Sequence, residues 1–73
     1  MSPRLPALTG QVMLAILHRQ GFVQVRQSGS HVIVKHPDGR RTTVPVHVGR
    51  DLGRGLLRQI MRDTNLTVDD LVG

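Results

Sequence analysis

Two runs of alternating residues, joined by a tight-turn tetrapeptide, constrain the fold of this chain more than any other feature. The tetrapeptide is His36-Pro37-Asp38-Gly39, in which proline presets φ at the second position and glycine tolerates a positive φ at the end. The runs at 31–36 and 41–47 are rich in β-branched residues, so we predict an antiparallel hairpin. A three-residue loop then sets the register. It pairs His36 with Arg40, Val34 with Thr42, Val32 with Val44, Ile33 with Thr43, Lys35 with Arg41, and His31 with Pro45.

Helical patterns flank the strands. Apolar residues recur at helical spacing before them (Leu8, Val12, Met13, Ile16 and Leu17) and after them (Leu56, Leu57, Ile60 and Met61), which predicts helices over about 10–20 and 54–64. Thr9 is suited to cap the first helix and Gly21 to end it. Thr67 and Asp70 have the spacing of a capping box for a short last helix.

A further alternating run at 22–26 predicts another strand. Pro45 cannot donate to a ladder, which suits the edge strand of a three-stranded meander. We therefore predict an α+β fold with the order α-β-β-β-α, in which both helices pack on one face of the sheet. Residues 1–73 form one domain in this interpretation, with a flexible leader over 1–7.

Composition narrows the classes of partner. The chain of 73 residues has no cysteine, which excludes disulfide frameworks and thiolate zinc sites. Its formal charge is +5 and nine of its ten cations are arginine, which favours a polyanionic partner. Phe22 is the one aromatic residue, so a platform that stacks RNA bases on exposed rings is not expected. No run is long enough to span a bilayer or to act as a signal peptide, and we expect a cytoplasmic protein.

The predicted register gathers titratable and cationic side chains on the sheet face away from the helices. If Val32, Val34 and Val44 point into the core, the intervening residues point outward. Gln24 and Arg26 join them if Val23 and Val25 point inward, and His47 lies diagonal to His31 if the last strand continues to 47. The expected patch consists of Arg26, His31, Lys35, Arg41 and His47.

Five short motifs together resemble the HicA family of toxins from bacterial toxin–antitoxin pairs. In chain order they are Gly21-Phe22, Gly29-Ser30-His31, His36-Pro37-Asp38-Gly39-Arg40, Val44-Pro45-Val46-His47, and the GLLRQI segment at 55–60. The resemblance implies a fold like that of double-stranded-RNA-binding domains and cleavage of mRNA by a strand histidine without a metal. It also implies restraint by a HicB-like antitoxin. Val32 stands where many relatives have a second histidine.

The resemblance assigns the histidine role to His31 and the preceding loop to Gly29 and Ser30. Imidazole titrates near neutral pH and can act as a general acid or base, whereas arginine can hold a phosphate in its planar fork. We expect His31 to be catalytic, Gly29 to shape the loop, and His47 to be a possible second proton carrier. The expected RNA- and phosphate-binding residues are Arg26, Ser30, Lys35, Arg41 and Arg58. No metal or other cofactor is expected.

Other interpretations stay open. A non-catalytic RNA-binding module would share the fold and charge but cleave nothing. A protein-binding domain could use the same basic surface to dock an acidic partner. Arg54, Arg58 and Arg62 recur every four residues, which is typical of a solvated helix face but would also suit phosphate contacts.

Overall fold

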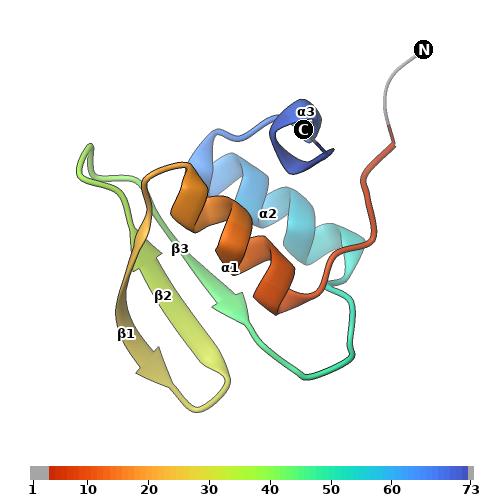
Figure 1. The fold of residues 1–73 in the computed structure, drawn as a ribbon, viewed down its shortest axis with the longest axis horizontal. Helices are drawn as coiled ribbons and strands as arrows, with labels where there is room; N and C mark the ends of the chain where they lie inside the picture. The colour runs from red at the N-terminus through yellow and green to blue at the C-terminus, as the bar shows by residue number, and fades with distance from the viewer. Residues whose placement is uncertain (1–3, 73) are drawn as a thin grey trace.

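Three antiparallel strands form one sheet between helical segments in the computed structural model, which describes residues 4–72 (Figure 1). The sheet order is β1-β2-β3. The elements are α1 (Gly10–Arg19), β1 (Val23–Ser28), β2 (His31–Lys35), β3 (Arg41–Pro45), α2 (Arg54–Thr64) and α3 (Val68–Val72). This arrangement confirms the predicted α-β-β-β-α order of an α+β, double-stranded-RNA-binding-domain-like fold, with β3 at an edge of the sheet.

The β2–β3 hairpin has the predicted register, from His31 opposite Pro45 to Lys35 opposite Arg41. The His36 N–H donates to the Arg40 carbonyl at 2.8 Å, and Gly39 has the positive φ of 103° that the loop requires. Asp38 braces this loop, because it accepts from the Arg40 backbone N–H at 3.0 Å and from Arg40 Nε at 2.8 Å. The Arg40 backbone bond is the main cause that lowers the pKa of the Asp38 carboxyl, and the Arg40 side chain adds to it.

The hairpin end is tied to the helical layer. The Phe22 ring lies 5.1 Å from the His36 ring in an edge-on arrangement, and the Arg40 guanidinium also lies 5.1 Å from the Phe22 centroid. Arg40 donates through Nη1 to the Thr64 carbonyl at the end of α2. His36 therefore faces the helices and not the sheet face of His31, as the register predicts.

The prediction for the facing of β1 is wrong at Val23 and Gln24, the start of the strand. Val23 pairs with Lys35 and Gln24 with Val34, so Val23 lies on the outer face and Gln24 on the helical face. A bulge between Gln24 and Arg26 then shifts the register. Val23 points away from the helices and Val25 lies in the bulge, and the two side chains are 51% and 55% exposed. The extra residue in the bulge places Arg26 opposite Ile33 on the outer face, so the predicted side for Arg26 is correct.

The helix ends follow local signals. The Thr9 side chain accepts from the Val12 N–H at 3.2 Å, and Gly21 after α1 has φ 96°. At α3 the Thr67 N–H donates to Asp70 at 2.7 Å and the Asp70 N–H donates back to the Thr67 hydroxyl at 3.3 Å. These contacts confirm the predicted caps.

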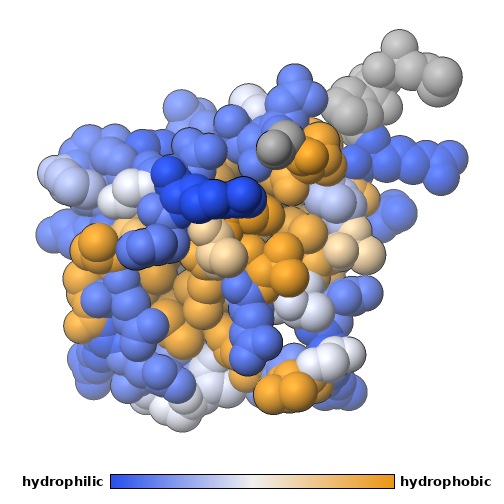
Figure 2. All heavy atoms as spheres, in the orientation of Figure 1, coloured by the Kyte–Doolittle hydropathy of each residue, from blue (hydrophilic) through white to orange (hydrophobic). Residues whose placement is uncertain are grey.

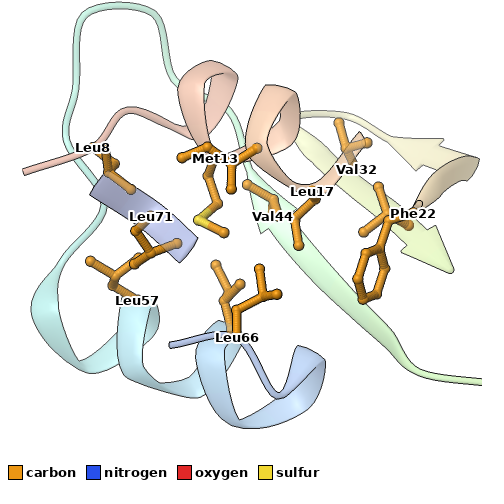
Figure 3. Close-up of a cluster of buried hydrophobic side chains, with 12 residues drawn as sticks. Leu8, Met13, Leu17, Phe22, Val32, Val44, Leu57, Leu66 and Leu71 are labelled. Atoms are coloured by element: carbon orange, nitrogen blue, oxygen red, sulfur yellow. The ribbon is translucent and has the colours of Figure 1, made fainter. Parts of the chain in front are cut away.

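One hydrophobic core lies between the sheet and the helices. Figure 3 shows Phe22 at one end and Leu8 with Leu57 at the other. The buried apolar residues come from both sides of the core: Leu8, Met13, Ile16, Leu17, Phe22, Val32, Val34, Val44, Leu57, Ile60, Leu66 and Leu71. Val12 belongs to the apolar face that predicts the first helix, but it is 46% exposed, and Leu14 packs against the core instead. Burying a side chain as large as Phe22 stabilises the fold by about 1.5–3 kcal/mol.

The surface is largely polar. Figure 2 shows hydrophilic residues over much of the face in view, with an apolar band where α1 meets the sheet. Between residues 4 and 72, no helix has the length and apolar character needed to cross a membrane.

Candidate active-site groove

A groove runs between the free edge of β3 and α2, the helix that packs beside that strand. Its first part has a volume of about 500 Å³ and its second part about 380 Å³. Pro45 and Leu56 line both parts, so we treat them as one feature, the β3–α2 groove. The first part is lined by His31, Arg41, Thr42, Thr43, Pro45, Leu56, Gln59, Ile60 and Asp63. The second is lined by Pro45, His47, Arg50, Asp51, Leu52, Gly53 and Leu56.

His31 is the first residue of β2 and lines the first part of the groove. It follows a two-residue loop, Gly29-Ser30, because Ser28 pairs directly with His31. Gly29 has φ 59°, and a positive φ at the first loop position is the place where this kind of hairpin requires glycine. The His31 side chain is exposed on the outer sheet face. It is therefore open to a ligand that lies over the sheet and enters the groove.

Arg41 is the cation that shares the first part of the groove with His31. Lys35 stands directly opposite Arg41 in the ladder, and Arg26 stands opposite Ile33 on the same outer face. Lys35 and Arg26 are exposed but do not line the groove. Like charges directly opposite one another in a sheet repel, so an anion bound between Lys35 and Arg41 would be stabilised.

His47 does not lie on a strand beside His31, contrary to the prediction. The ladder continues only to the Val46 N–H, which donates to the Ser30 carbonyl at 2.7 Å. The chain then turns, with the Arg50 N–H donating to the His47 carbonyl at 3.0 Å. The turn leads the chain back toward α2 and leaves His47 in the second part of the groove. The two histidines thus line adjoining parts of one groove.

The α2 wall of the groove was missed by the sequence analysis. It consists of Leu56, Gln59, Ile60 and Asp63. The Thr42 hydroxyl donates to Asp63 Oδ2 at 2.9 Å and so joins β3 to this wall. Gln59 and Asp63 are four residues apart and therefore share one face of the helix. That spacing is visible in the sequence, but the strand that this face meets is not.

A second cationic feature lies on another part of α2. Arg4, Leu5, Arg54 and Arg58 line a hollow of about 450 Å³, which we name the arginine hollow. Arg62, which follows Arg54 and Arg58 at the same spacing of four residues, does not line this hollow. The structure thus separates Arg58, predicted to bind phosphate, from Arg62, although both are exposed on the same helix.

Proton transfer and anion binding are the chemistry that these side chains offer. Within residues 4–72, histidine and acidic side chains form no group of three that could hold a metal ion. Imidazole transfers protons near neutral pH, and the arginine fork binds phosphate oxygens in pairs.

A comparison with known protein families identifies the family of this chain. The family described as the HicA toxin of bacterial toxin-antitoxin matches residues 10–66, a span that runs from α1 past the end of α2. The chain therefore belongs to the HicA toxin family. As a HicA-family member it is a toxin of a toxin–antitoxin system, and membership implies an antitoxin partner. A comparison with curated proteins gives no match.

Proposed function

We propose that this HicA-family toxin is a metal-independent endoribonuclease that cleaves mRNA in the cytoplasm. The observation that carries the proposal is that His31, an exposed imidazole, shares a hollow with Arg41. The same outer face presents Lys35 and Arg26, which provide further positive charge for a polyanion. Family membership supports the same activity.

The reaction that fits these groups is cleavage by the neighbouring 2′-hydroxyl. A base removes the 2′-hydroxyl proton as O2′ attacks the phosphorus. The bond from phosphorus to the 5′-oxygen then breaks, and an acid donates a proton to that oxygen. The products are a 2′,3′-cyclic phosphate and a 5′-hydroxyl, with no oxidant, metal or co-reactant needed. His31 serves as general acid or base, and His47 is the candidate for the second proton transfer.

The cations stabilise the charge that develops on the phosphorane. We assign Arg41 to the scissile phosphate, because it lines the same part of the groove as His31. Lys35 and Arg26 bind neighbouring phosphates on the outer face, and Arg58 binds phosphate in the arginine hollow. Ser30 contacts RNA from the loop that Gly29 shapes. Each of these side chains is accessible to RNA, either from solvent or from the groove.

The antitoxin in this proposal is a HicB-like protein that covers the outer sheet face and the mouth of the groove. Blocking His31 is the most direct way to silence an enzyme with one site. A partner with acidic groups would also neutralise Lys35 and Arg41, which face each other across the ladder.

The test is cleavage of a labelled RNA by the wild-type protein and by His31→Ala, both in EDTA. Because His31 is exposed, its truncation should change the free energy of unfolding by no more than a few tenths of a kcal/mol. Cleavage should fall by about 10²- to 10⁴-fold, the usual contribution of a positioned acid or base. RNA binding should persist because the arginines remain. His18→Ala is the matched control, since it removes an exposed histidine from the end of α1.

Three outcomes would contradict the proposal. A wild-type protein that binds RNA without cleaving it would be the non-catalytic binding module. Cleavage that stops in EDTA and returns with magnesium would remove the histidine mechanism. A folded His31→Ala variant that cleaves at the wild-type rate would exclude His31 as the acid or base.

A further inference from the structure

Gln59 and Asp63 form a polar pair on the wall opposite His31, and the reaction described above does not use them. The chain has only five acidic residues. Asp38 holds the hairpin loop and Asp70 caps α3, so both have a local structural role. A carboxylate in a groove that binds phosphates repels them. The Asp63 carboxylate is favourable in this groove if the RNA group that reaches it carries N–H donors.

Apolar side chains line the same part of the groove. Ile60 is fully buried, and Leu56 and Pro45 are partly buried beside it. The volume of about 500 Å³ falls within the range of about 300–1,000 Å³ typical of small-ligand sites. The lining combines these three apolar residues with six polar or charged ones, so a ligand there meets both kinds of surface. A flat base can pack against the partly exposed Leu56 side chain and the Pro45 ring here, although no Phe, Tyr or Trp among residues 4–72 lines the groove.

The Thr42 hydroxyl orients the Asp63 carboxylate. Thr42 is 4% exposed, and its hydroxyl donates to Asp63 Oδ2 at 2.9 Å. This bond occupies one lone pair of Oδ2 and leaves Oδ1 free. The bond from Thr42 thus holds the Asp63 carboxylate in one orientation before any ligand binds. Less side-chain entropy is then lost when a ligand binds.

We propose that the first part of the β3–α2 groove holds the base next to the scissile phosphate and that Gln59 and Asp63 select guanine there. Guanine presents two adjacent donors, N1–H and N2–H₂, which a carboxylate accepts together. Its O6 can accept from the Gln59 amide N–H₂. Adenine and cytosine place a ring acceptor beside their amino group, and uracil places a carbonyl on each side of its one N–H. Each of these three bases would therefore point a lone pair at the Asp63 carboxylate.

The position of this base next to a cleaved phosphate rests on the proposed function, but base selection itself can be measured without cleavage. The probe is a fluorescein-labelled ten-nucleotide uridine RNA with G, A, C or U at one central position. Binding is measured by fluorescence anisotropy in a His31→Ala background, which prevents turnover. The G-containing RNA should bind about tenfold more tightly than the all-U RNA, a difference typical of a bidentate contact to one base.

Asp63→Asn should bring the G-to-U affinity ratio close to one, while its side-chain carbonyl can still accept from Thr42. Asp69→Asn is the matched control, because it removes the same charge from an exposed position on α3. Both variants should bind the A-, C- and U-containing RNAs more tightly through reduced repulsion, but only the control should keep the preference for guanine. Gln59→Ala truncates an exposed side chain and should lower the ratio without affecting folding.

Equal binding of the four RNAs by the parent protein would overturn the proposal. A guanine preference that survives both Asp63→Asn and Gln59→Ala would also overturn it. The same RNAs incubated with the protein that retains His31 separate the two proposals. Guanine preference without cleavage would remove the proposed function and leave base selection standing. Cleavage without guanine preference would remove base selection and leave the proposed function standing.

Discussion

His31 stands opposite Pro45 at a position of the β2–β3 ladder where the two residues share no backbone hydrogen bond. The neighbouring Val46 N–H donates to the Ser30 carbonyl at 2.7 Å, and hydrogen-bonded and non-hydrogen-bonded pairs alternate along an antiparallel ladder. The missing N–H of proline therefore removes no bond to β2. Side chains of non-hydrogen-bonded pairs approach more closely, so the pyrrolidine ring adjoins the imidazole where both line the groove.

His47→Ala should lower the rate of RNA cleavage by less than tenfold, a smaller loss than the roughly 10²-fold or more expected for His31→Ala. The reason is that His47 lines the second part of the groove and not the part that holds His31 and Arg41. Single-turnover rates of both variants on one RNA test this expectation. An equal loss for the two variants would instead make His47 a full partner in proton transfer.

Arg58→Gln should make the salt dependence of RNA affinity shallower, whereas Arg62→Gln should leave it unchanged. Arg58 lines the arginine hollow with Arg4 and Arg54, and Arg62 does not. Each phosphate contact contributes a log–log slope of about −0.7 on single-stranded RNA, so the slope should change by about 0.7 for Arg58→Gln. Titrations between about 50 and 200 mM salt measure it. Equal salt-dependence slopes for the two variants would mean that Arg54, Arg58 and Arg62 form only a solvated helix face.

Arg41→Glu should weaken binding of both RNA and the HicB-like antitoxin. Arg41 faces Lys35 and lines the groove that the antitoxin is proposed to cover. Arg19→Glu, at the exposed end of α1, is the control for the change in net charge. Isothermal titration of purified partners compares the variants. Normal antitoxin affinity in Arg41→Glu, with RNA affinity lost, would place the inhibitory contact on another surface.

Gly10→Ala should destabilise the fold by about 1–3 kcal/mol, the usual effect of overpacking. A Cβ at Gly10 would collide with the Pro45 carbonyl oxygen and lie 3.1 Å from the Val46 Cα, so α1 would have to move away from β3. Gly55→Ala is the matched control, because a Cβ there meets nothing within 4 Å. It should stabilise α2 by about 0.5–1 kcal/mol. Chemical denaturation of both variants checks the opposite signs.

The hairpin, the helix caps and the outward position of His31 could be predicted because their causes are local. Loop length and the period of two determine which residues of β2 and β3 share a face. The same reasoning failed at the start of β1, since the alternation of Val23 and Val25 does not reveal a bulge. His47 was misplaced because nothing local shows that the chain turns away from β2 after Val46.

The sequence by itself determined that His31, Lys35 and Arg41 lie on one sheet face, because a register set by a three-residue loop cannot slip without exposing Val32, Val34 and Val44. Only the tertiary structure decided that Gln59 and Asp63 stand across the edge of β3 from His31. That placement depends on the connection between β3 and α2, where the Leu52 N–H donates to the Leu8 carbonyl at 2.7 Å. It also depends on long-range bonds such as that between Thr42 and Asp63. Such contacts join residues far apart in the chain, and no local pattern specifies them.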